Sequence, residues 1–166
     1  NTQLRYSIIK LVDKLGVTSE TIQITQRGGS SQDIYVATAG TLAQQINSED
    51  AKILEELKIT GHLNTFDYEF LKTMPNLKTV DLSELSDTSI PASAFNNSLV
   101  STVLLPLNLK TISDRAFYNS SITSIYIPQT VESIGQYAFA NILKLTGNIV
   151  IPSKTATIGE RAFEYS

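Results

Sequence analysis

The side chains that could carry out catalysis are few in this 166-residue chain. It contains one histidine, His62, and no cysteine, so zinc sites built from several histidines or cysteines are excluded. A Ser-His-Asp triad would have to use His62, which directly follows an alternating apolar run, a position typical of a surface turn. We therefore predict no catalytic role for it.

Acidic residues offer the other candidate chemistry. Glu49-Asp50 and Glu55-Glu56 are paired carboxylates, but both pairs lie on a predicted helix as solvated charges. Glycosidases need two carboxylates about 5–10 Å apart across one cleft, and no such cleft is predicted. Asp81, Glu84 and Asp87 lie close in sequence but lack the glycine and spacing of an EF-hand loop. Incidental calcium binding is the metal chemistry left open for them.

Composition excludes further classes of function. The segment RGGSS lacks the Lys-Ser/Thr that a P-loop requires, so a hairpin turn is the simpler interpretation. A net charge of −3 argues against non-specific nucleic-acid binding. No apolar stretch reaches the roughly 18 residues of a membrane span. We predict a protein that is not an enzyme and needs no cofactor or metal.

A single pattern repeats from the middle of the chain to its end. Four Ala-Phe pairs recur at separations of 22, 22 and 24 residues, with phenylalanines at Phe95, Phe117, Phe139 and Phe163. Isoleucines and prolines keep the same interval, at Ile112, Ile134 and Ile158 and at Pro106, Pro128 and Pro152. Alternating apolar runs recur at a similar interval, ending at Ile59, Leu82, Leu105, Ile127 and Ile151.

Period-2 strands at this interval are typical of a solenoid in the 20–29 residue range of leucine-rich repeats. One such turn cannot bury its apolar face alone, so the turns must stack. We predict two inward columns of strand residues, a third column of isoleucines, and a phenylalanine in the middle of each turn. The inward strand residues are Val80 and Leu82, Val103 and Leu105, Ile125 and Ile127, and Ile149 and Ile151. The alternative is a β-sandwich, whose strands recur every 8–12 residues without a shared motif.

These motifs resemble the BspA-like leucine-rich repeat proteins, the Treponema-type class found in bacterial surface proteins. The family pattern is a strand ending in Leu-Pro, then Ile-Gly-x-x-Ala-Phe, then Asn or Cys. It is carried by Ile127-Pro128, Ile134-Gly135 and Ala138-Phe139-Ala140-Asn141, and again by Ile151-Pro152, Ile158-Gly159 and Ala162-Phe163. In the turn before, Ser113 replaces the glycine, and the turn around SIPASAF lacks the isoleucine-glycine element.

The resemblance covers roughly residues 54–166. It implies an α/β or mainly-β, right-handed solenoid with parallel strands on a concave face and short helices or turns on the convex side. It also implies a surface or secreted location and an adhesive or recognition role. Three asparagines follow the phenylalanines by two residues, and we expect them to stack and satisfy backbone groups: Asn97, Asn119 and Asn141.

Residues 1–50 carry no repeat, and we predict that they form an N-terminal cap on a solenoid of about five turns over residues 51–166. The spacing of Leu4, Ile8, Leu11, Val12 and Leu15 predicts a helix. The segments ETIQIT and DIYVAT read as strands of a loose hairpin, and TLAQQI and SEDAKILEEL as helices, the second capped by Ser48.

Strand parity also predicts which residues face outward. The central outward row contains Lys58, Asp81, Leu104, Tyr126 and Val150. A flanking row is polar: Glu56, Thr79, Thr102, Ser124 and Asn148. A small exposed apolar stripe with an aromatic anchor is typical of an interaction site, although such residues also simply suit strands.

The favoured function is a non-catalytic module that binds a protein or glycan on its concave strand face. The alternatives are a structural spacer without its own ligand and, more distantly, an enzyme. The first residue is asparagine rather than methionine, so we expect that a leader was removed and that the protein is extracellular, on the cell surface or periplasmic. The chain stops three residues after Phe163, before another strand could form. Either the natural protein continues, or the open edge favours self-association.

Overall fold

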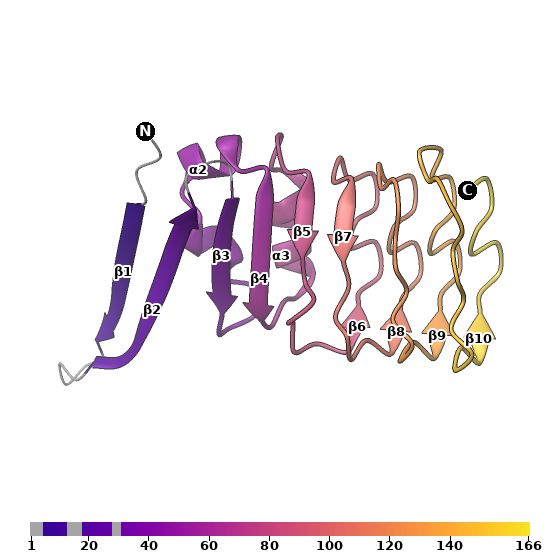
Figure 1. The fold of residues 1–166 in the computed structure, drawn as a ribbon, viewed down its shortest axis with the longest axis horizontal. Helices are drawn as coiled ribbons and strands as arrows, with labels where there is room; N and C mark the ends of the chain where they lie inside the picture. Colours follow the sequence, from indigo (N-terminus) through magenta and orange to yellow (C-terminus); the bar gives the residue numbers. More distant parts are fainter. Residues whose placement is uncertain (1–4, 13–17, 28–30) are drawn as a thin grey trace.

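The computed structural model describes residues 5–12, 18–27 and 31–166. These residues form ten strands, which make two sheets, and three helices. One sheet has the strand order β1-β2-β3-β4-β5-β7, and the other has the order β10-β9-β8-β6. Figure 1 shows successive turns of the chain following one another along the long axis, with β6, β8, β9 and β10 along one edge. This arrangement is consistent with the predicted repeat solenoid.

The first three strands are antiparallel neighbours. Strand β1 (Arg5–Val12) pairs with β2 (Thr18–Arg27), which pairs with β3 (Ser31–Val36) through Gln26–Gln32 and Arg27–Ser31. The predicted hairpin is therefore confirmed between β2 and β3, while residues 28–30 lie outside the described residues.

The helix predicted from Leu4 to Leu15 is wrong wherever the structure describes the chain, because β1 occupies residues 5–12. Its two ends, residues 4 and 13–15, lie outside the described residues. The run RYSIIKLV contains enough apolar and β-branched residues to fit both the helical and the strand periodicity. It forms a strand because β2 pairs with it through an antiparallel ladder, which the local pattern does not show.

Two short helices follow β3. Helix α1 spans Leu42–Gln45 and α2 spans Ser48–Ile53. Asn47, rather than the predicted Ser48, caps α2, since its side-chain oxygen accepts the backbone N–H groups of Glu49 at 3.0 Å and Asp50 at 2.9 Å. The helix was also predicted too long. It ends at Ile53, so Glu55 follows it and Glu56 opens the next strand.

Four strands of the larger sheet are parallel and in register. Strand β3 pairs with β4 (Glu56–Gly61), β4 with β5 (Thr79–Asp81), and β5 with β7 (Thr102–Leu104). Their inward residues are buried, including Ile59, Val80 and Val103. The three strands predicted at these places are confirmed.

Helix α3 (Thr65–Lys72) lies between β4 and β5 in the chain. It begins with a capping box, in which Asn64 Oδ1 accepts the Phe66 N–H at 2.9 Å and Asp67 Oδ2 accepts the Asn64 N–H at 2.9 Å. Asp67 is buried and also accepts the backbone N–H groups of Gly40 at 2.6 Å and Leu42 at 3.0 Å. One carboxylate therefore ties α3 to the segment that starts α1.

The predicted isoleucine column forms a sheet of its own. Strands β6 (Ser89–Ile90), β8 (Thr111–Ile112), β9 (Ser133–Ile134) and β10 (Thr157–Ile158) pair in parallel, each adding one layer. Ile90 aligns with Ile112, so the SIPASAF turn does carry the isoleucine, and only its glycine is missing. Gly135 is required, since a Cβ there would lie 2.5 Å from the Asp114 nitrogen of the preceding turn.

The strands predicted in ITSIYIP and TGNIVIP do not form. The first is reduced to a single bridge between Thr102 and Ser124, and the structure has no strand over residues 145–151. The predicted burial partly holds, because Ile127 is buried while Ile125 and Ile149 are half-buried. Ile151 and Ile158 are 37% and 52% exposed, since no further layer packs over them in the described structure.

The phenylalanine column is confirmed as the middle of the core. Neighbouring rings stack almost parallel, with centroids 5.2, 5.2 and 5.3 Å apart along Phe95, Phe117, Phe139 and Phe163. Tyr68 of α3 closes this column with an edge-on contact to Phe95 at 5.5 Å. None of the helices in the described part of the chain is both long enough and apolar enough to cross a membrane.

Candidate functional site

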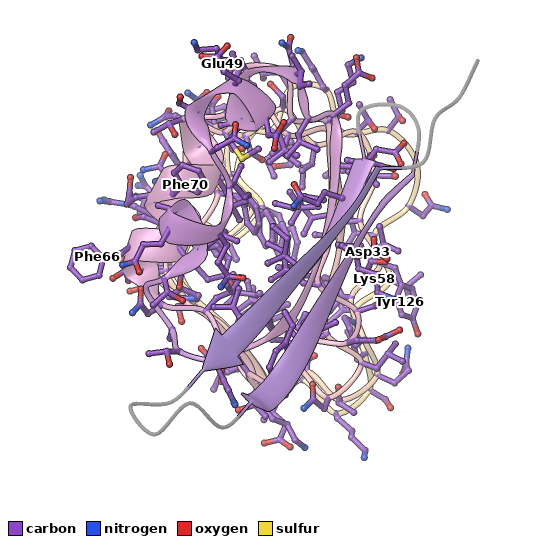
Figure 2. The ribbon with its side chains drawn as sticks, turned by 90° about the vertical axis from the view of Figure 1, so that its left-hand side faces the viewer. Asp33, Glu49, Lys58, Phe66, Phe70 and Tyr126 are labelled. Atoms are coloured by element: carbon purple, nitrogen blue, oxygen red, sulfur yellow. The ribbon has the colours of Figure 1, made fainter. Side chains whose placement is uncertain are left out.

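Three of the predicted outward residues lie on strands of the larger sheet, and the other two lie in the strandless turns that follow it. We call Lys58, Asp81, Leu104, Tyr126 and Val150 the outer strand row. Sheet register places Lys58 beside Asp81, and Asp81 beside Leu104. Figure 2 shows Lys58 and Tyr126 on the side opposite Phe66 and Phe70 of α3. The predicted parity is therefore confirmed for Lys58, Asp81 and Leu104, whose strands pair in register. Tyr126 and Val150 are exposed as predicted but lie outside any strand, and the binding role of the row stays a prediction.

The N-terminal half of the row is charged. Asp33 of β3 is the register partner of Lys58, whose Nζ lies 2.7 Å from Glu84 Oε1. The Glu84 carboxylate raises the pKa of Lys58 above its usual value, with smaller contributions from Asp81 and Asp33. Asp81 also accepts the backbone N–H of Ser83 at 2.9 Å. This half offers a fixed pattern of alternating charge.

The other half of the row is apolar and exposed. Leu104, Tyr126 and Val150 are 42%, 65% and 66% exposed. Leu104 and Tyr126 line a shallow groove of about 270 Å³ together with Leu107. Polar residues border it, among them Ser83, Thr102 and Ser124. An apolar stripe beside a charged one can hold a partner by burying surface and fix its orientation by charge.

Leu107 is a residue of this groove that strand parity missed. It follows Pro106 in the turn and is exposed. The corresponding residues after Pro128 and Pro152 are Gln129 and Ser153. An apolar residue at a place where sister turns carry polar ones is the signal that could have found it.

His62 and the acidic cluster are brought together in a way that the sequence did not predict. His62 Nδ1 lies 2.9 Å from Asp87 Oδ1, and Asp87 Oδ2 accepts the Leu63 N–H at 2.7 Å. Among the described residues, no serine or threonine hydroxyl hydrogen-bonds to the other ring nitrogen of His62. The pair is therefore a turn-fixing contact without the nucleophile of a triad.

The carboxylates considered for calcium do not converge. Glu84 pairs with Lys58, Asp87 pairs with His62, and Asp81 accepts a backbone N–H. Residues 31–166 bring no three metal-ligating side chains together. This geometry gives the calcium interpretation no support.

The predicted asparagine ladder is confirmed, and it extends along the surface of the turns. Asn119 Nδ2 donates to Asn97 Oδ1 at 2.7 Å, and Asn141 Nδ2 donates to Asn119 Oδ1 at 2.8 Å. All three residues have left-handed backbones, with φ of 57°, 53° and 60°. The side chains bond to one another rather than to backbone groups, which corrects the expected partner. Their backbone N–H groups reach the carbonyl oxygens of the next turn.

The family model of the BspA type leucine rich repeat region matches residues 49–166 of this chain in six copies. This range contains the stacked turns and their repeated motifs. The chain belongs to this family. The resemblance found over residues 54–166 is thus confirmed. No curated protein matches the chain significantly. A BspA-type repeat region suggests a protein-interaction module, and repeat regions of this kind are generally non-catalytic scaffolds.

Proposed function

We propose that this BspA-type chain is a non-catalytic binding module of an exported or cell-surface bacterial protein, and that its outer strand row recognises a protein partner. In this proposal the repeats form a right-handed solenoid and residues 1–50 cap its first layer. The observation that carries the proposal is the groove between Leu104, Leu107 and Tyr126, which exposes apolar surface bordered by polar residues.

The chemistry of the row favours a protein over a glycan at this place. A tyrosine flanked by aliphatic side chains is a typical anchor of protein interfaces, where aromatic residues dominate the binding energy. The fixed charges of Lys58, Glu84 and Asp81 at the other end would orient the partner and set the salt dependence of association. The family's interaction role supports the same interpretation.

A binding screen tests the proposal. Purified chain is immobilised on a biosensor and exposed to a panel of extracellular-matrix and plasma proteins, and any protein that binds is titrated against Tyr126→Ala. We expect the affinity to fall by about tenfold or more, since truncating an anchor residue commonly costs more than about 1.4 kcal/mol. Phe66→Ala is the matched control, because Phe66 is an exposed aromatic residue on the opposite side.

Two results would count against this assignment. Binding that survives Tyr126→Ala but falls with Phe66→Ala would move the site to the helical side. A panel without any bound protein would favour the alternative role as a structural spacer.

We also propose that the last turn takes part in self-association. Ile151, Ile158 and Phe163 line a hollow of about 550 Å³ at this end of the core. Apolar surface of this kind is stabilised when a second molecule covers it. Light scattering over a hundredfold range of concentration tests this: we expect the average mass to rise for the wild type and to stay constant for Ile158→Asp.

A further inference from the structure

A second hollow lies on the turns, apart from the outer strand row. It has a volume of about 530 Å³, inside the range of roughly 300–1,000 Å³ that is usual for small-molecule sites. We call it the arginine–tyrosine hollow. Its lining residues are Asn96, Asn97, Arg115, Tyr118, Tyr137, Arg161 and Glu164. None of them lines the groove at Tyr126.

The repeat itself builds this hollow. Arg115, Tyr137 and Arg161 occupy the same place in three successive turns, at separations of 22 and 24 residues. All three have left-handed backbones, with φ of 55°, 54° and 55°. Tyr118 and Glu164 follow the two arginines by three residues in their turns. The stacked phenylalanines fix the spacing of these turns, so the lining residues are held by the core.

The aromatic rings hold the guanidinium groups in place. Arg115 Cζ and Arg161 Cζ lie 5.7 and 5.9 Å from the centre of the Tyr137 ring, within the range of cation–π contacts. Arg161 Nη1 also donates to the Tyr137 hydroxyl at 3.1 Å. The Tyr118 ring meets that of Tyr137 edge-on, at 6.4 Å between centroids. Side chains fixed in this way lose little further freedom when a ligand binds.

The hollow offers hydrogen-bond donors and acceptors side by side. Arg161 Nε lies 3.4 Å from Glu160 and 3.8 Å from Glu164, so its charge is compensated. Arg115 has no carboxylate within 4.0 Å among the described residues, which leaves its donors available. Asn96 also lines the hollow, but its side-chain oxygen is buried and has no hydrogen-bond partner in the described part of the chain, so this oxygen does not face a ligand.

This composition narrows the class of ligand. An apolar ligand would find no aliphatic side chain on the walls. A fully deprotonated anion such as sulfate would bond to Arg115, but it has no proton to donate to the Glu164 carboxylate. A sugar ring has hydroxyl groups that both donate and accept, and it can therefore donate to Glu164 and accept from Arg115 at the same time.

We propose that the arginine–tyrosine hollow is a carbohydrate-binding site for a hydroxyl-rich, uncharged sugar. In this site the Glu164 carboxylate accepts from sugar hydroxyls, the Arg115 guanidinium donates to them, and the Tyr118 hydroxyl adds a further donor or acceptor. The site shares no lining residue with the groove on the outer strand row, so in this proposal the module holds a glycan and a protein at two separate places.

A glycan array tests the proposal with defined probes. Labelled wild-type chain is applied to printed neutral, fucosylated, sialylated and sulfated oligosaccharides, and the strongest neutral ligand is titrated by calorimetry. We expect Glu164→Gln and Arg115→Lys to weaken its binding at least tenfold. Arg115→Lys keeps the charge but loses the planar set of donors. Both residues carry a Cβ, so the substitution does not change the strain of the left-handed backbone at this position. Thermal unfolding of each variant confirms that it folds as the wild type does.

The controls separate this site from the outer strand row. Tyr126→Ala should leave glycan binding unchanged, whether or not the row binds a protein. Three results would overturn the proposal: no neutral glycan is bound, only sulfated or sialylated glycans are bound, or binding is unaffected by both Glu164→Gln and Arg115→Lys. Loss of glycan binding with Tyr126→Ala would overturn it as well, since the sugar would then lie on the strand face.

Discussion

The phenylalanine column is the single feature on which the stack of turns most depends. Phe139 lies between two rings, at 5.2 Å from Phe117 and 5.3 Å from Phe163, and is fully buried. We expect Phe139→Ala to lower the free energy of unfolding by about 3–5 kcal/mol, since it removes a large buried side chain and leaves a cavity. Tyr126→Ala should cost less than about 1 kcal/mol, because its ring lies largely in water. Urea denaturation measures both, and equal losses would refute the inward and outward assignment.

Tyr68 carries a polar group that the core does not use. Its ring is buried, and its hydroxyl has no hydrogen-bond partner among the described residues. An unpaired buried hydroxyl costs about 1–3 kcal/mol of desolvation. Tyr68→Phe should therefore be as stable as the wild type at pH 7, or more stable, in urea denaturation.

Burial also makes Tyr68 sensitive to alkaline pH. It raises the pKa of this hydroxyl above its usual value near 10, with smaller contributions from Asp87 and Asp67. Above that pH the unfolded tyrosine ionises while the folded one keeps its proton, so stability falls as pH rises. Between pH 9 and 11 we expect Tyr68→Phe to lose less stability than the wild type, while the exposed-residue control Tyr126→Phe follows the wild type. A loss as steep in Tyr68→Phe as in the wild type would contradict the assignment.

The asparagine ladder combines two effects that substitution can separate. Asn119 adopts φ of 53° and its amide bonds to the asparagines above and below it. Asn119→Ala loses both the amide contacts and a residue suited to this backbone, which together should cost about 1–2 kcal/mol. Asn119→Gly loses only the contacts, and we expect a smaller loss in thermal denaturation. Both variants lose the ladder contacts equally, so a larger loss for Asn119→Gly would mean that a Cβ at this left-handed backbone costs less than the extra freedom of glycine in the unfolded chain.

At the level of elements, Asp67 decides how α3 attaches to the rest of the chain. This buried carboxylate accepts N–H groups from Gly40, Leu42 and Asn64, the first two from outside its helix. Asp67→Ala should cost at least about 3 kcal/mol, because it leaves several N–H groups without acceptors. Glu69→Ala on the same helix removes only an exposed pair with Lys72 and should cost less than about 1 kcal/mol. Chemical denaturation compares the two, and similar losses would show that Asp67 is not what attaches α3.

Several elements with repeated motifs could be predicted from the sequence, but an element that depends on its neighbours could not, even where its motif repeats. The runs ending at Ile59 and Leu82 alternate clearly, and their strands form as expected. The segment 5–12 fits a helix and a strand nearly equally, so its partner β2 decides. The strand expected before Pro152 is absent although its residues alternate, since only a neighbouring ladder makes a strand.

Of the two candidate sites, one could be predicted from the sequence and the other could not. Strand parity placed Lys58 and Tyr126 on the outside, because side chains alternate by rule along an extended chain. The arginine–tyrosine hollow could not be anticipated in this way. Its geometry depends on left-handed backbones at Arg115, Tyr137 and Arg161, and these residue types give no sign of positive φ. Repetition of the position every 22–24 residues was the available signal.

For the whole molecule, stability comes from each layer covering the next, so the first layer matters more than its size suggests. Strand β3 pairs with β4 along its whole length, and Ile34, Val36 and Leu42 are buried. Residues 31–50 thus cover the end of the repeat core that begins at β4. The proposed cap over residues 1–50 would act mainly through this portion.

Two truncations test that division of the cap. Removing residues 1–50 exposes the edge of β4 and the core beneath it, so we expect aggregation or loss of a cooperative unfolding transition. Removing only residues 1–30 keeps β3 in place, and we expect a soluble chain that unfolds cooperatively with a lower midpoint. Size-exclusion chromatography and urea denaturation read out both. A soluble, cooperative monomer after the longer truncation would mean that the repeats need no cap, whereas collapse after the shorter one would make the β1–β2 hairpin the essential cover.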